Sequence, residues 1–145
     1  MKLSTRGRYG TRLVLDLSIH YGRGPILLKD IAKRTEITEK YLWQLIAPLK
    51  NAGLINSTRG ASGGYELAKN PKQISLKDVI YVLEGSMCLV DCVDNACCCS
   101  RSETCVSRDI WMDISEKITQ TLESNNFADM VEKFKSKQNL QVYSI

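Results

Sequence analysis

All six cysteines of the 145-residue chain lie between Cys88 and Cys105, in the segment "CLVDCVDNACCCSRSETC". Thiolates are soft ligands that suit iron–sulfur clusters and zinc, and they are also nucleophiles that form disulfides. Segment 86–106 has neither a helical nor a strand period, and unpatterned segments of this length are usually functional or disordered. The cysteines therefore indicate metal binding or redox chemistry on a loop.

The rest of the sequence favours a reducing compartment for these thiols. No run of about 18 apolar residues occurs, and the opening stretch "MKLSTRGRYG" lacks the apolar core of a signal peptide. We therefore expect a cytoplasmic protein with no membrane partner. Clustered cysteines in the cytoplasm are more often metal ligands or redox centres than structural disulfides.

The charge is divided unevenly along the chain. Residues 1–70 carry 12 Lys/Arg against 5 Asp/Glu, whereas residues 71–145 carry 8 against 11. A basic half joined to a mildly acidic half suggests that the first half faces a polyanion. A plain solvated basic surface would give the same balance, so the charge alone does not decide between them.

Apolar residues at helical spacing predict the elements that would position these groups. A helix over 5–21, a short helix near 28–32 and a third helix over 39–52 capped by Thr38 precede two strands that flank the glycine-rich turn "RGASGG". Ser75 and Asp78 predict a capping pair for a helix over 76–83. A helix over 107–124 and a weak short helix over 127–134 with a mobile tail complete the chain.

Two short helices followed by a glycine-tipped hairpin are the parts of a winged helix-turn-helix. We expect a mainly α fold with a small β-hairpin wing and a long helix behind it. The third helix would enter a major groove and the wing a minor groove. The candidate DNA-binding residues come from the third helix, the wing and the start of the first helix: Thr38, Lys40, Tyr41, Gln44, Arg59, Gly60, Arg6, Arg8 and Tyr9.

Four segments in order resemble the Rrf2 family of transcriptional regulators. They are "TRGRYGTRLVLDL", "LKDIAKRTEITEKYLWQLIAPLKNAGLI", "RGASGGYELAK" and "ISLKDVIYVLEG", with "CVSRDIWMDISEKI" continuing the match. The resemblance implies a homodimeric repressor that binds double-stranded DNA at an inverted repeat. It divides the chain into a DNA-binding domain (1–85), a cluster loop (86–106), a dimerisation helix (107–124) and a C-terminal segment (125–145). Alternatively, the helix over 107–124 folds back on its own chain.

The resemblance also implies an iron–sulfur cluster in the cysteine loop, with 2Fe–2S favoured over 4Fe–4S. The ligand set that it indicates is Cys92, Cys98, Cys99 and Cys105, with Cys88 and Cys97 as further candidates. The family takes its fourth ligand from a histidine or from an acidic residue of the partner's first helix. Those positions hold Arg108 and Arg8 in this sequence, so an all-cysteine site is the solution that the chain itself offers.

Other readings of the thiols remain open. Zinc could occupy the loop, although the paired C-x2-C units of zinc fingers are absent. A metal-free thiol switch could use Arg101 and Arg108 to lower a thiol pKa, and a regulator could also act through a protein partner. An enzyme is not expected, because the only histidine, His20, lies far in sequence from the thiols and no small-molecule substrate motif occurs.

Overall fold

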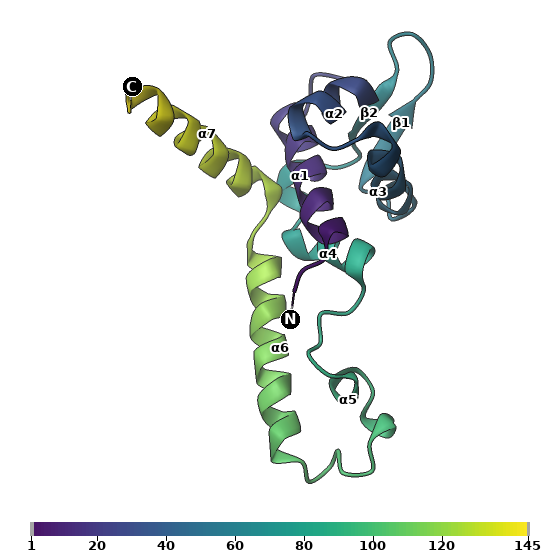
Figure 1. Cartoon of the computed structure of the whole chain (residues 1–145), viewed down its shortest axis with the longest axis vertical. Coiled ribbons are helices and arrows are strands. Elements are labelled where there is room, and N and C mark those ends of the chain that lie inside the picture. Colours follow the sequence, from purple (N-terminus) through teal and green to yellow (C-terminus); the bar gives the residue numbers. More distant parts are fainter. Residues whose placement is uncertain (1, 145) are drawn as a thin grey trace.

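The computed structural model describes residues 2–144 and is mainly helical within that range (Figure 1). Its single sheet is a two-stranded antiparallel hairpin, which confirms the predicted fold class. The elements in chain order are α1 (Thr5–Ile19), α2 (Leu28–Thr35), α3 (Glu39–Asn51), β1 (Ile55–Thr58), β2 (Gly64–Leu67), α4 (Leu76–Glu84), α5 (Asp91–Asp94), α6 (Val106–Ser124) and α7 (Phe127–Tyr143), with short 3-10 turns at Pro71–Gln73 and Ala96–Cys98.

The first three helices surround a common core because each buries one apolar stripe. Leu13, Val14 and Leu17 of α1 are at most 1% exposed and meet the fully buried Leu42 and Leu49 of α3 in the same cluster. Burial of such side chains contributes about 1.5–3 kcal/mol each. This core fixes the outward-facing side of α3 relative to α1.

Local capping sets where these helices begin and end. The Thr38 hydroxyl accepts a hydrogen bond from the Tyr41 N–H at 3.2 Å and starts α3, as predicted. At the other end Gly53 has a φ of 76°, and the Leu54 N–H donates to the Leu49 carbonyl. That pairing is a glycine-terminated helix end, and it turns the chain directly into β1.

The hairpin is held against the helical body by a neighbouring segment. Ile55 pairs with Leu67 and Thr58 with Gly64 across the two strands. Ile26 adds an isolated bridge to Tyr65, with N–H to carbonyl distances of 2.9 and 2.8 Å. The wing is therefore tied to the segment that precedes α2 rather than hanging freely.

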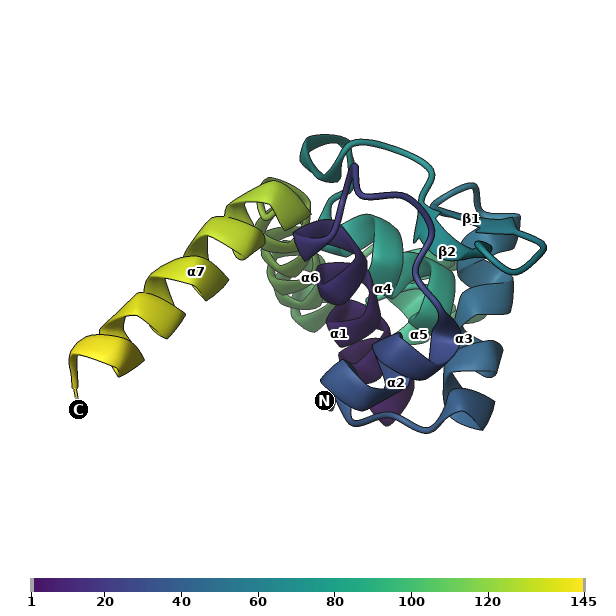
Figure 2. The ribbon, with the colours of Figure 1, turned by 90° about the horizontal axis from the view of Figure 1, so that it is seen from above.

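Helix α4 packs on α1, whereas the cysteine loop, α6 and the end of α7 extend away from this body (Figures 1 and 2). Helix α6 runs beside α4 and the cysteine loop, while α7 packs its first turns on α1 and then projects outward. The helix predicted over 127–134 is longer than expected, since α7 continues to Tyr143. Its sequence contains three Lys and two Gln, which favour helix without forming a clear apolar stripe.

The cysteine segment is also more structured than its lack of period indicated. Helix α5 and the 3-10 turn interrupt it, and Asn95 accepts a hydrogen bond from the Cys97 N–H at 3.1 Å.

None of the helices within residues 2–144 combines the length and apolar character needed to span a membrane.

Candidate nucleic-acid interface and cysteine loop

Helix α3 presents a polar face opposite its buried leucines. Thr38, Lys40 and Gln44 are exposed, as the sequence predicted, whereas Tyr41 is half-buried. The Tyr41 ring meets the Tyr9 ring edge to face with centroids 5.7 Å apart. Tyr9 and Tyr41 therefore join α1 to α3, and the other three side chains are free to meet a ligand.

The wing lies beside the C-terminal half of α3 and leaves a groove between them. Arg59 and Gly60 are exposed at the turn of the hairpin. A hollow of about 430 Å³ separates helix from wing, and its lining includes Trp43, Lys50 and Arg59. Lysine and arginine beside a groove of this kind suit the sugar–phosphate strand that lies between a major and a minor groove.

The groove contains residues that the sequence reading missed. Trp43 is 59% exposed, and its ring meets the Tyr65 ring edge to face at 6.4 Å. The Lys50 ammonium donates to the Ser57 hydroxyl at 2.5 Å and so links α3 to β1. Trp43 directly follows the buried Leu42 and directly precedes Gln44, a predicted DNA contact. That neighbour in the sequence could have marked Trp43 as a candidate residue of the interface.

The start of α1 supplies the remaining predicted residues. Arg6 and Arg8 are exposed in its first turns, and the Arg8 guanidinium donates to the Thr5 hydroxyl at 3.3 Å. The Arg12 guanidinium lies 5.2 Å from the Tyr9 ring centroid in a cation–π contact. Basic side chains thus occur on both α1 and the groove between α3 and the wing.

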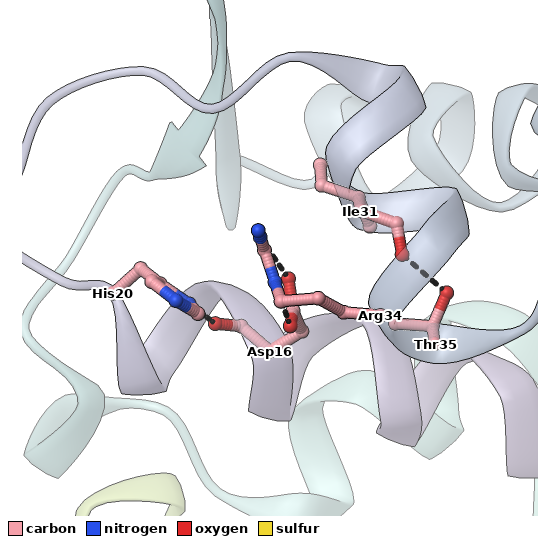
Figure 3. A network of polar contacts seen from close by, with 5 residues as sticks. All are labelled: Asp16, His20, Ile31, Arg34 and Thr35. Atoms are coloured by element: carbon pink, nitrogen blue, oxygen red, sulfur yellow. Dashed lines mark hydrogen bonds and ion pairs between the residues drawn. The ribbon is translucent and has the colours of Figure 1, made fainter.

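A polar network fixes α2 against α1 at the end of this surface (Figure 3). The Arg34 guanidinium donates to both carboxylate oxygens of Asp16 at 2.9 Å, and Asp16 is only 7% exposed. The hydrogen bond to Asp16 raises the pKa of Arg34, which keeps the guanidinium charged. Since α2 leads into α3, the pair helps to orient the helix that carries Lys40 and Gln44.

His20 belongs to the same network and not to the cysteine loop. Its Nδ1 lies 2.8 Å from the Asp16 carbonyl of its own helix (Figure 3). The C-terminal end of α1 lies at the opposite end of the molecule from the cysteine loop (Figure 1). Its position agrees with the expectation that His20 does not work with the thiols.

Two side chains of α6 hold the backbone of the cysteine loop. The Arg108 Nε donates to the Cys92 carbonyl at 2.8 Å, and the buried Ser115 hydroxyl accepts from the Leu89 N–H at 3.3 Å. Residues seven apart on a helix lie on the same face. Arg108 therefore anchors the segment that carries Cys92.

The six thiols occupy two kinds of environment. Cys88, Cys92 and Cys105 are half-buried near α6, whereas Cys97, Cys98 and Cys99 are exposed. Burial raises the pKa of the Cys88 thiol, and its 2.8 Å hydrogen bond to Asp94 raises it further. Desolvation raises the pKa of Cys98, with smaller contributions from Cys92 and Cys99.

These shifts are opposite to the lowered thiol pKa expected beside Arg101 and Arg108. The Arg108 guanidinium instead contacts a backbone carbonyl, and Asp94 stabilises the protonated form of Cys88. Thiols in this state must lose protons before they bind a metal. The pKa values of Cys88 and Cys98 therefore give no sign of activation by a cation.

The donor chemistry of the loop suits an iron–sulfur cluster, although the loop is open. Within residues 2–144, no three Cys, His, Asp or Glu side chains converge as a metal ion would require. Cys98 lies close enough to Cys92 and Cys99 for their charges to shift its pKa. The exposed triplet would have to close toward Cys92 and Cys105 to complete a site.

Known proteins share this arrangement over most of the chain. Residues 3–133 match the Rrf2 family model, described as an iron-dependent transcriptional regulator. Protein rrf2 of Nitratidesulfovibrio vulgaris is 43% identical over 131 residues, which cover 90% of this chain and 87% of that protein. The HTH-type transcriptional regulator CymR of Bacillus subtilis is 37% identical over the full length of both chains.

A solved structure agrees with the sequence comparison. T. potens IscR superposes with a TM-score of 0.78 at 40% identity, covering 95% of this chain and 91% of that one. The matched region includes the winged helix-turn-helix and the helices that follow the cysteine loop. The chain therefore belongs to the Rrf2 family of DNA-binding transcriptional regulators, which are not enzymes.

Proposed function

We propose that the chain acts as a homodimeric repressor that reads an inverted repeat with two copies of α3 and two wings. The observation that carries this proposal is the groove between α3 and the wing, which is lined by Lys50, Arg59 and the exposed Trp43. The exposed Gln44 follows Trp43 on α3. Glutamine pairs with adenine in the major groove, and arginine suits a narrow minor groove. Thr38, Lys40, Arg6 and Arg8 would contact phosphates or base edges nearby.

Fluorescence anisotropy with labelled duplex tests this reading directly. A duplex selected by the protein from a random library serves as the probe, because the operator sequence is unknown. Arg59→Ala should weaken binding by about 1–3 kcal/mol and lower the salt slope. Lys133→Ala on the exposed side of α7 is the matched control, and an equal effect of both substitutions would remove Arg59 from the interface.

The second copy would pack on the exposed apolar side of α6. Val106 is 72% exposed and Ile110 54%, which is unusual for a helix that otherwise covers its own chain. At ~100° per residue these side chains lie about 160° from Arg108, on the opposite side of α6 from the cysteine loop. One helix would therefore meet both the loop and the partner.

The cysteine loop would control DNA binding through this helix. Cys92, Cys98 or Cys99, and Cys105 would hold an iron–sulfur cluster, with Cys88 or Cys97 available as a further thiolate ligand. When bound, a cluster supplies sensitivity to iron, oxygen or nitric oxide. The contacts of Arg108 and Ser115 with the loop backbone would pass a change in loop shape to α6 and hence to the spacing of the two DNA-binding domains.

A metal-free thiol switch is the second candidate. It is favoured by the open loop, with its exposed thiol triplet, and by the full-length similarity to CymR, whose solved form is described as the global cysteine regulator of B. subtilis. Two thiols of the triplet region would then lose two protons and pass two electrons to a small-molecule oxidant such as a peroxide, and the resulting disulfide would replace cluster loading as the signal.

Anaerobic purification separates the two candidates. Iron and acid-labile sulfide in stoichiometric amount, with visible absorption, would support the cluster. Colourless protein with zinc would support a zinc site, and colourless protein free of metal whose DNA affinity changes on thiol oxidation would support the switch. Cys92→Ser should abolish the visible absorption, and full retention of that absorption would contradict the ligand assignment.

A further inference from the structure

The first turn of α1 is capped by its own Ser4 hydroxyl and also by a carboxylate from another helix. No acidic residue lies in that turn, although helix N-termini favour negative charge. The Ser4 hydroxyl accepts a hydrogen bond from the Gly7 N–H at 3.2 Å. The Glu84 Oε1 accepts hydrogen bonds from the N–H groups of Ser4 and Gly7, both at 3.1 Å, and from the Ser4 hydroxyl. A single oxygen at the end of α4 thus satisfies several donors at the start of α1.

Two glycines make this close approach possible. A Cβ added to Gly7 would lie 2.5 Å from the Glu84 Oε1, and one added to Gly10 would collide with the Leu83 side chain. Both glycines are buried and face the C-terminal turn of α4. The spacing of Gly7 and Gly10 therefore matches the line of contact between the two helices.

Glu84 also lies where three parts of the chain meet. It ends α4, Gly85 follows with a φ of 80°, and the cysteine loop begins at the next residue. A cavity of about 380 Å³ beside it is lined by Leu3, Cys88 and Ile118. The start of α1 lies next to the end of α4 in Figure 1.

We propose that Glu84 is a positioning residue for DNA binding, because its carboxylate fixes the α1 turn that presents Arg6 and Arg8 to the duplex. The inference rests on the proposed function, in which these arginines contact phosphates. Two guanidinium groups next to a helix N-terminus repel its partial positive charge, and Glu84 offsets that repulsion. Without it the Ser4 N–H and hydroxyl lose their acceptor, and only the Ser4 hydroxyl still caps Gly7. The turn is then less ordered, and the arginines must be ordered at the moment of binding.

The proposal predicts an effect opposite in sign to simple charge removal. Deleting a carboxylate from a DNA-binding protein removes repulsion from phosphates and should strengthen binding. Loss of the α1 cap should instead weaken it. The sign of the change in affinity therefore distinguishes a positioning role for Glu84 from a general electrostatic one.

Anisotropy titrations with the selected duplex, using full-length protein, compare Glu84→Ala, Glu84→Gln and the charge control Glu132→Gln. Glu84→Ala should bind about 3- to 30-fold more weakly, the range expected for loss of a capping contact, and with a smaller salt slope. Glu84→Gln should be weakened less, because its amide oxygen still accepts from the same N–H groups. Glu132→Gln, on the exposed side of α7, should bind as tightly as the parent or more tightly.

The arginines themselves separate the inference from the proposed function. If Arg6→Ala and Arg8→Ala leave affinity and salt slope unchanged, the start of α1 is outside the interface and that part of the proposed function fails. If they weaken binding while both Glu84 variants bind as tightly as the parent or more tightly, only the positioning role is overturned. Should Glu84→Ala unfold at the assay temperature, Glu84→Gln decides by the same criterion.

Discussion

Replacing Gly64 by alanine should destabilise the protein strongly, because the added methyl group would meet the backbone of residue 26. Gly64 starts β2 with a φ of 151°, and an added Cβ would lie 2.2 Å from the Ile26 carbonyl oxygen. The obstructing atoms are backbone, so they cannot rotate away as a side chain would. The wing must therefore move away from residue 26, or the backbone of β2 must change.

The cost can be worked out from the two contributions. An alanine held at an unfavourable positive φ costs about 1–3 kcal/mol. Separation of the wing also breaks the two hydrogen bonds between Ile26 and Tyr65, at about 0.5–1.5 kcal/mol each. We therefore expect Gly64→Ala to lower the free energy of unfolding by about 2–6 kcal/mol.

Gly60→Ala is the matched control in the same hairpin. Gly60 also has a positive φ, 107°, but an added Cβ would meet no atom within 4 Å. Urea denaturation followed by circular dichroism, at one protein concentration for all variants, should show a smaller loss of unfolding free energy for Gly60→Ala. The difference between the two variants should equal the contribution of the two hydrogen bonds between Ile26 and Tyr65. Losses equal to within about 0.5 kcal/mol would refute the argument that Ile26 holds the wing.

Three further perturbations test other contacts. Asp94→Ala should lower the pKa of Cys88, because the carboxylate accepts a hydrogen bond from the thiol and disfavours the thiolate. The rate of Cys88 labelling by iodoacetamide, resolved by mass spectrometry, should then reach half its maximum at a lower pH. An unshifted plot of labelling rate against pH would contradict the contact. Asp16→Ala should destabilise by about 1–3 kcal/mol in urea, since Arg34 loses its buried partner; no change would mean that the pair contributes nothing. Ile110→Glu should convert a dimer to monomer in light scattering, and an intact dimer would place the interface elsewhere.

Much of the DNA-binding half could be predicted because its signals are local. The Leu stripe of α3, the Thr38 cap and the capping box of Ser75 with Asp78 each depend on residues within one or two helical turns. The glycine-rich hairpin likewise encodes its own turn. Such patterns survive into the structure because tertiary packing buries the stripe that the period already defines.

Contacts between distant segments could not be predicted in the same way. Nothing in the neighbouring sequence distinguishes Glu84 from any other glutamate at the end of a helix. Only the fold brings its carboxylate to the N–H groups of Gly7 and Ser4. The apolar stripe expected along 107–124 also proved to be divided. Ile118 lines a cavity of its own chain, whereas Ile110 is exposed.

This division of α6 gives the cysteine loop a physical route to the rest of the molecule. Arg108 and Ser115 hold backbone groups at Cys92 and Leu89, not the thiols themselves. A ligand that closes the thiol triplet toward Cys92 must therefore either keep those two hydrogen bonds and shift α6, or break them and release the loop. In both cases the contacts that differ between the free and the ligand-bound loop lie on α6. A coupling free energy of about 1–3 kcal/mol between ligand binding at the loop and DNA binding would change DNA affinity by about 5- to 150-fold.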